Sequence, residues 1–412
     1  MTTTTTTKNQ PSLLASLQSA LQKRETRLSR RRLTILPPTS TDFSSNDFLS
    51  LSTSPLFRAR LLAHLQSAPP RYPFASGGSR LLDGNSPYAE ALDAHEGMRL
   101  SRAGKTVPFL HSSPESLEAV LTAEIAADAG IRDGSRNVFV VVESVYSMDG
   151  DIAPLREFVE VVERVLPCGN GYFVVDEAHA TGVFGPGGAG VVKELGLQER
   201  MFVRVHTFGK ALASHGAIVL CCPDTRDYLI NYARTVIYTT AMGFPSLAAI
   251  RTAYELLSEG ETEEPQATLQ SLIRYLRARL ASLDTLTLTL TLDEDGNPTG
   301  NPTPLFAVDH FPRSPIFSLR SPVPRHLAAA CQRKGFVVRA IMAPTVPVGK
   351  ERVRVCLHAG NTVEEIDGLV ETIRGWLVER QSPQTQTQSQ SQSQGLGLGM
   401  GQAQGEKRVA RL

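Results

Sequence analysis

The chain has 412 residues, of which 42 are basic and 41 are acidic, so its net charge is only +1. This balance argues against a nucleic-acid-binding surface and against strong electrostatic attraction to a membrane. A chain of this length can bury a large core and is expected to contain two domains. No apolar run is long enough to span a bilayer, and the threonine-rich start lacks the hydrophobic core of a signal peptide, so we expect a soluble protein.

The cysteines indicate a reducing compartment. Their number is odd, none has a C-x-x-C spacing, and they occupy positions Cys168, Cys221, Cys222, Cys331 and Cys356. This pattern argues against a disulfide framework, and no metal site is predicted.

The N-terminal segment, residues 1–60, contains a basic cluster formed by Lys23, Arg24 and the stretch from Arg27 to Arg32. The cluster could meet phosphate groups of a ligand, but a solvated helix face or a targeting segment is the more ordinary interpretation. An arginine-rich, serine-containing start also leaves a mitochondrial address open.

Residues 61–245 alternate between strand-like and helix-like patterns, which predicts an α/β domain with a mostly parallel sheet. Pro154 is expected at the first position of a helix. The predicted strands are Val138–Val142, Tyr172–Val175, Phe202–His206 and Ala217–Cys221.

Two of these strands end in residues suited to pyridoxal phosphate chemistry. Tyr172–Val175 is apolar enough to be buried, and Asp176 at its carboxyl end could keep a pyridine nitrogen protonated. After Phe202–His206, Lys210 could form a Schiff base and Thr207 could offer a hydroxyl to a phosphate. Glycines 209 and 216 would let the backbone approach a cofactor closely.

Each of these residues also has an ordinary structural interpretation. Asp176 could be only a helix N-cap, Lys210 a solvated charge, and His179 a structural histidine near a strand end. Their occurrence together favours a cofactor site.

The second half of the chain predicts a smaller α/β domain over residues 246–380, entered through a helix from Pro245 to Ser258. Alternation of threonine and leucine from Thr285 to Leu292 is typical of a strand. The other expected elements are helices near Leu269–Leu283 and Thr362–Arg380, and strands near Ser314–Leu319 and Arg352–Leu357.

Residues 381–412 are rich in glutamine, serine and glycine and are expected to be a disordered tail. The tail ends in Ala410-Arg411-Leu412, which is similar to the Ser-Lys-Leu peroxisomal address. We therefore expect a peroxisomal protein that meets an import receptor there, with the cytoplasm or the mitochondrion as the alternatives.

Long motifs carry a family resemblance. DEAHATGVFGPGGAG and HTFGKALASHGAIVL resemble the α-oxoamine synthases, class-II aminotransferase-like enzymes of fold type I that use pyridoxal 5'-phosphate to condense an amino acid with an acyl-CoA. Further matches are Asn46–Ser50, Gly77–Leu81, Ser147–Asp151 and Ala343–Pro347. The chain is most similar to the members that join L-alanine to pimeloyl-CoA with decarboxylation, although members that use glycine remain an alternative.

The resemblance implies a role for each residue of the motifs. Lys210 would bind the cofactor aldehyde and later remove the α-proton of the amino acid. Asp176 would pair with the pyridinium nitrogen and His179 with the phenolic oxygen of the ring. Ser147 would support that corner, and Thr207 would hold the phosphate.

The segment Ile237–Thr240 resembles one that reaches the cofactor phosphate of a neighbouring subunit, through Thr239 and Thr240. The resemblance therefore implies a homodimer. Arg352 and Arg354 alternate along a predicted strand and should face the same side, and one of them is the candidate for clamping the substrate carboxylate. Two exposed strand arginines are the alternative.

The chain departs from the family between His95 and Met98. Members of the family continue there through a few dozen residues that contain a strand, a phosphate-binding turn and a histidine that stacks on the cofactor ring. Their loss would expose apolar surface and unpaired backbone. The alternatives to a synthase are therefore a noncatalytic paralogue that acts as a dimerisation partner, or a truncated splice or gene-model product.

Overall fold

The computed structural model describes residues 13–26, 30, 37–68, 74–81, 85–86, 105–283, 289–290, 303–304, 306–309, 311 and 313–381. Two compact units are present, Met1–Ser40 and Thr41–Leu412. The first contains helix α1 (Leu13–Thr26). The family departure near His95 and the terminal tripeptide Ala410-Arg411-Leu412 lie outside the described residues, so the predictions made there stay predictions.

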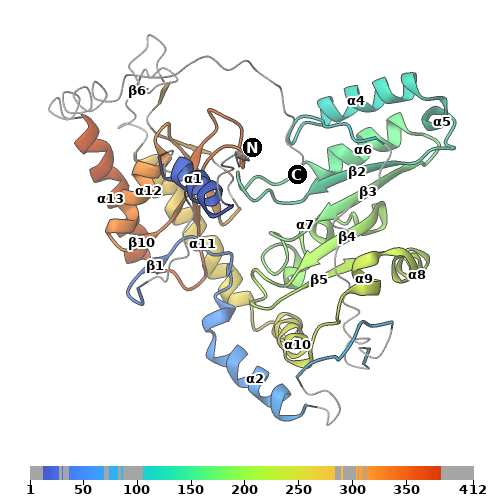
Figure 1. Cartoon of the computed structure of the whole chain (residues 1–412), viewed down its shortest axis with the longest axis horizontal. Helices are drawn as coiled ribbons and strands as arrows, with labels where there is room; N and C mark the ends of the chain where they lie inside the picture. The colour runs from blue at the N-terminus through green and yellow to red at the C-terminus, as the bar shows by residue number, and fades with distance from the viewer. Residues whose placement is uncertain are drawn as a thin grey trace, which may run out of the picture. The chain divides into compact units, whose positions relative to one another are not determined.

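The second unit contains the predicted cofactor sheet. Its strands lie in the order β2-β3-β4-β5, side by side in Figure 1, and β2, β3 and β4 are mutually parallel while β5 is antiparallel to β4. The strands are β2 (Val138–Glu143), β3 (Gly171–Asp176), β4 (Met201–Thr207) and β5 (Ala217–Leu220). The predicted mostly parallel sheet and its four strands are confirmed.

Helix α6 (Leu155–Val165) connects β2 to β3 and buries one face, with Phe158 fully inaccessible to solvent. Pro154 lies at the N-cap of this helix, with φ −76° and ψ 67°, so the prediction that it occupies the first helical position is wrong by one residue. Because ψ at Pro154 is not helical, the helix can begin only at the next residue. Helix α4 (Pro114–Ala127) packs beside α6.

The remaining helices between residues 41 and 258 include the predicted bridging helix, α10. They are η1 (Leu51–Thr53), α2 (Pro55–Gln66), α5 (Ala129–Arg132), η2 (Pro186–Gly188), α7 (Val191–Glu194), η3 (Gln198–Arg200), α8 (Pro223–Tyr232), α9 (Arg234–Tyr238) and α10 (Phe244–Ser258). The bridging helix α10 agrees with the prediction from Pro245 to Ser258.

The smaller sheet is antiparallel, with strand order β11-β12-β9-β8. Its strands are β8 (Ala307–Asp309), β9 (Ile316–Arg320), β11 (Arg339–Ile341) and β12 (Arg352–Cys356), and helices α11 (Glu263–Ala281), α12 (Pro324–Arg333) and α13 (Val363–Gln381) accompany it. A further parallel pair joins β1 (Thr41–Asp42) to β10 (Phe336–Val337).

Part of the predicted strand Thr285–Leu292 is seen, because β6 (Thr289–Leu290) pairs with β7 (Thr303–Pro304); the remaining residues lie outside the described ranges. One hydrophobic cluster includes core residues of both sheets, such as Val140 and Phe317. Among the described helices, none has the length and apolar character needed to cross a membrane.

Candidate functional site

Asp176 ends strand β3 at the edge where parallel strands of α/β sheets present ligand-binding side chains. Its Oδ1 accepts a hydrogen bond from the backbone N–H of Ala178 at 2.7 Å, which closes a tight turn. A turn follows Asp176, so the N-cap interpretation does not describe this residue. His179 lies in this turn, and its side chain is buried.

Glu177, which the sequence analysis did not assign, is fully buried beside Asp176. Its Oε1 accepts a hydrogen bond from the backbone N–H of Val192 at 2.9 Å, which ties the strand end to the glycine-rich loop that follows. A Cβ at Gly190 would lie 1.5 Å from Glu177 Oε2, and the φ of Gly190 is +95°, so only glycine fits there. Burial raises the pKa of Glu177 to about 7.

Lys210 projects from a compact loop between β4 and β5. The backbone N–H of Phe208 donates to Gly216 O at 2.9 Å, and that of Ser214 donates to Phe208 O at 2.9 Å. Gly216 has a φ of +101°, and a Cβ there would lie 2.7 Å from Met242 Sδ, which explains the glycine in the motif. Since Phe208 is buried, the loop is anchored and Lys210 is held at the sheet edge.

The charged groups of this edge act on one another. Burial lowers the pKa of Lys210, and the guanidinium of Arg354 lowers it further, whereas the carboxylates of Asp176 and Glu143 raise it. Burial, Lys210 and Arg354 together lower the pKa of His179 to about 3. His179 is therefore neutral at physiological pH, and one of its ring nitrogens can donate a hydrogen bond while the other accepts one.

The buried polar atoms without a hydrogen-bond partner among the described residues include His179 Nδ1, Thr207 Oγ1 and Arg354 Nε. Buried polar atoms are nearly always paired, so such unpaired groups point to a missing ligand. A phenolic oxygen, a phosphate and a carboxylate would suit these three atoms, and Asp176 offers a carboxylate to a pyridinium nitrogen. These residues therefore fit pyridoxal phosphate with a bound amino acid.

The two predicted arginines have different surroundings, although both lie on β12. Arg352 is only 3% exposed, forms an ion pair with Asp149, and donates from Nε to Lys350 O at 2.9 Å. Arg354 donates from Nη2 to Asn46 Oδ1 at 2.8 Å and influences the pKa of Lys210. Arg354 is thus the arginine near the reactive edge, and Asn46 orients it.

Asn46 is a site residue that the sequence analysis did not assign, although its motif Asn46–Ser50 carried part of the resemblance. Only the fold brings it to Arg354, because the two residues are 308 positions apart. Ser147 donates its backbone N–H to the carboxylate of Glu143 and is half-buried. This contact fixes the loop after β2 next to the carboxylates of the strand ends.

Thr239 and Thr240 directly follow α9 and are exposed. Among the described residues, no hydrogen bond joins either threonine to the loop of Lys210 or to the other predicted site residues.

A second polar cluster lies close to the loop of Ser147, where ligand atoms of His111, Asp149 and Asp151 are within 4.8 Å of one another. The cluster is held by contacts inside the protein. Asp151 accepts from His111 Nε2 at 3.0 Å, and Asp149 pairs with Arg352. The cluster thus serves to connect the loop to β12.

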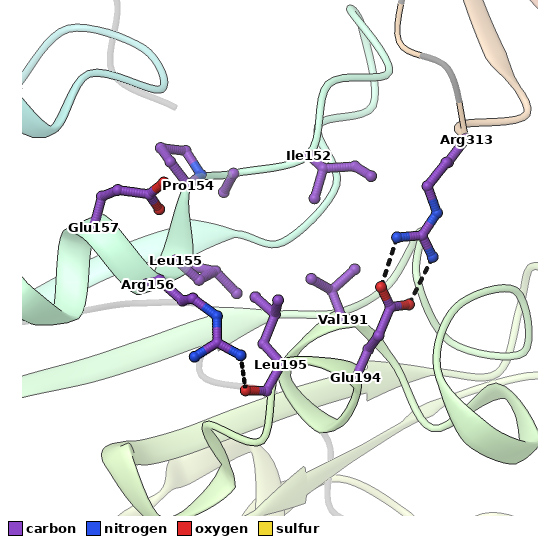
Figure 2. A pocket seen from close by; sticks show the side chains of 10 residues that line it. Ile152, Pro154, Leu155, Arg156, Glu157, Val191, Glu194, Leu195 and Arg313 are labelled. Atoms are coloured by element: carbon purple, nitrogen blue, oxygen red, sulfur yellow. Dashed lines mark hydrogen bonds and ion pairs between the residues drawn. The ribbon is translucent and has the colours of Figure 1, made fainter.

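A pocket of about 230 Å³ lies next to this loop, beginning at Ile152 and extending to Leu195. Figure 2 shows that Arg313 pairs with both carboxylate oxygens of Glu194 and that Arg156 donates to Leu195 O. None of the predicted site residues lines it.

Comparisons with known proteins agree with this arrangement. A profile of the family described as "Aminotransferase class I and II" matches residues 95–373. The chain is 61% identical over 407 residues to an 8-amino-7-oxononanoate synthase of Emericella nidulans, and the match covers 88% of this chain and 95% of that protein. It is 35% identical over 421 residues to an aminoacyl transferase sphA of Aspergillus fumigatus, with 89% of this chain and 87% of that protein covered.

Solved structures share the fold. A serine palmitoyltransferase from S. paucimobilis matches with a TM-score of 0.69 at 20% identity, and the match covers 89% of this chain and 98% of that chain. An 8-amino-7-oxononanoate synthase from Francisella tularensis matches with a TM-score of 0.54 at 19% identity, covering 84% and 100%. These likenesses confirm the expected fold of type I.

The alignment with the Emericella nidulans relative also bears on the expected missing segment. Its 407 positions exceed the 88% of this 412-residue chain that they contain. Dozens of the relative's residues therefore have no counterpart in the aligned part of this chain.

Proposed function

Because this chain belongs to the class I and II aminotransferases and, within them, to the α-oxoamine synthases, we propose that it condenses L-alanine with pimeloyl-CoA. Carbon dioxide and coenzyme A would leave, and 8-amino-7-oxononanoate would form for biotin synthesis. The cofactor is pyridoxal 5'-phosphate, as in the family. The observation that carries the proposal is the group of unpaired buried atoms, His179 Nδ1, Thr207 Oγ1 and Arg354 Nε, around Lys210 and Asp176.

The side chains would divide the work by their charges. Bound pyridoxal phosphate supplies an electron sink for the negative charge that develops on the α-carbon of the amino acid. Asp176 would hold a proton on the ring nitrogen, and neutral His179 would donate a hydrogen bond to the phenolic oxygen. Both contacts keep the ring electron-poor and correctly oriented.

Lys210 would carry the proton in this reaction. Its lowered pKa increases the fraction of neutral amine at physiological pH, and a neutral amine can accept the α-proton. Arg354, fixed by Asn46, would bind the substrate carboxylate through its guanidinium fork and hold the α-carbon near Lys210. Arg352 would take no part in binding, because Asp149 and the backbone of Lys350 already use its donors.

Exposed aromatic residues support the homodimer. Phe74, Tyr228, Tyr232 and Tyr238 are between 62% and 79% exposed, and aromatic residues are enriched at protein interfaces. Tyr238 directly precedes Thr239 and Thr240. We propose that these two exposed threonines reach the cofactor phosphate of the partner subunit.

The residues that the Emericella nidulans relative has and this chain lacks favour a second candidate function, a noncatalytic partner that dimerises with a complete synthase. The two candidates make different demands on Lys210. A synthase needs the amine to bind cofactor and to release coenzyme A, whereas a noncatalytic partner needs neither.

The test measures thiol release from pimeloyl-CoA with L-alanine, glycine or L-serine, together with a mass-spectrometric search for pyridoxyl-lysine after borohydride reduction. We expect release with L-alanine, a label on the peptide containing Lys210, and loss of both in Lys210→Ala. Release with glycine alone would indicate another α-oxoamine synthase. A protein with neither release nor label would support the noncatalytic partner.

A further inference from the structure

The outer edge of strand β2 is open among the described residues. Among the described strands, its one partner is β3, in parallel register. The amides of Val138 and Ser144 donate to the β3 side, each at 2.8 Å, so the amides of Phe139 and Val141 point the opposite way. Neither Phe139 nor Val141 forms a backbone hydrogen bond with another described element on that side.

The same residues expose an apolar surface. Phe139 is 54% exposed and Val141 is 66% exposed, whereas Val140 and Val142, on the other side of the strand, are buried at 4%. The ring of Phe139 lies 5.7 Å from that of Tyr172 and 5.8 Å from that of Phe202, so the exposed apolar surface continues across β3 and β4. An amphipathic strand normally presents polar residues to solvent, and this one does not.

Strand β2 also lacks the features that keep exposed edges apart. Its sequence, Val-Phe-Val-Val-Val-Glu, has no proline and no lysine, and its pairing with β3 is regular without a bulge. Natural edge strands usually carry one of these features, because an open flat edge is a template for another strand. Relatives contain dozens of residues that this chain lacks, so an edge that is covered in them can be open here.

We propose that the outer edge of β2 pairs antiparallel with the same edge of a second copy of this chain. A two-fold axis midway between the Val140 residues of the two copies places Phe139 of each copy opposite Val141 of the other. Residues 139 and 141 both point their N–H and C=O groups outward, so these pairs are the hydrogen-bonded ones. The exposed apolar faces of the two copies then lie on the same side and form one continuous surface.

The ends of the paired strands are complementary in this register. In this register the uncharged Asn137 stands opposite Glu143 of the other copy, so no two like charges are directly opposed. Each copy satisfies in the other the backbone groups that its own sheet leaves open. A second copy is therefore the occupant for which this edge is suited.

The test is sedimentation velocity over a range of protein concentrations, with three proteins: wild type, Val141→Lys, and Val348→Lys as the matched control. Val348 is 87% exposed and lies between β11 and β12 of the smaller sheet, so its substitution adds the same charge outside β2. Val141 is largely exposed, so its lysine removes no core packing. We expect concentration-dependent association in wild type and Val348→Lys, and association at least tenfold weaker in Val141→Lys.

Hydrogen exchange of the peptide spanning residues 137–143 gives the second readout. Its amides should be slow to exchange in wild type at high concentration and faster in Val141→Lys. Sedimentation of wild type that does not change with concentration would overturn the proposal, and slow exchange under those conditions would assign the edge to another segment of this chain. Equal weakening in Val348→Lys, or none in Val141→Lys, would also overturn it. The active dimer proposed above involves Thr239 and Thr240 and not β2. If Val141→Lys still forms that dimer but loses the pairing of β2 edges, the two associations are separate, and the proposed function stands independently of the β2 contact.

Discussion

The buried carboxyl of Glu177 makes the stability of this protein depend on pH in a predictable direction. Its pKa is raised from 4.5 to about 7 by burial. Below pH 4.5 the carboxyl is protonated in both the folded and the unfolded protein, and the stabilising contribution of the raised pKa is fully present. As the pH rises to about 7, the unfolded state releases its proton first, so this contribution is lost.

The magnitude follows from the shift. A change of one pKa unit corresponds to 1.36 kcal/mol, so Glu177 should cost the folded protein about 3 kcal/mol between pH 4 and pH 8. Glu177→Gln removes the titration while its amide oxygen can still accept from the N–H of Val192. We therefore expect wild type to lose about 3 kcal/mol of unfolding free energy relative to Glu177→Gln over this range.

The assay is urea unfolding at several pH values, followed by the fluorescence of the single tryptophan, Trp376, which is 6% exposed. Glu199→Gln is the matched control because Glu199 is an exposed carboxylate. The other titratable groups, including the three buried histidines, are present in every variant and cancel in the comparison. A difference between wild type and Glu177→Gln that is the same at pH 4 and pH 8 would refute the reasoning.

Three further predictions concern the site and the fold. Arg354→Gln should raise the L-alanine concentration needed for half-maximal thiol release by about a hundredfold at unchanged melting temperature, because it removes a bidentate carboxylate contact. Arg352→Gln should instead lower the unfolding free energy by about 1–2 kcal/mol, because it leaves the partly exposed carboxylate of Asp149 without its ion-pair partner. Equal effects of the two variants on both measurements would contradict the assignment. The chain as given should bind pyridoxal phosphate weakly. Insertion, between His95 and Met98, of the residues that the relative has and this chain lacks should increase both the cofactor absorption band and thiol release by about a hundredfold, because one lost anchor misplaces the reacting carbon. Equal values in the two proteins would show that the short chain builds its site differently. Finally, burial lowers the pKa of His206 to about 4. The free energy of unfolding that this residue contributes above pH 6.5 should therefore be lost as the pH falls towards 4. Acid unfolding curves of His206→Gln should show a smaller loss than those of wild type.

The sequence by itself determined the elements on which the site is built. The apolar run before Asp176 and the small-residue loop around Lys210 are local patterns, and a local pattern fixes where a strand ends and which side chain follows it. The parallel order of β2, β3 and β4 then brings these ends to one edge. This is why the predicted strands and the grouping of Asp176, His179 and Lys210 agree with the structure.

Tertiary structure decided what depends on distant contacts. Strand alternation places Arg352 and Arg354 on the same side, but only the contact of Arg352 with Asp149, and that of Arg354 with Asn46, separates their roles. The effect of Glu177 depends on its burial against Gly190. The edge of β2 that no described strand covers depends on the order of the strands in the sheet. Burial and pairing are set by residues far apart in the chain, and a local pattern carries no information about which of them will meet.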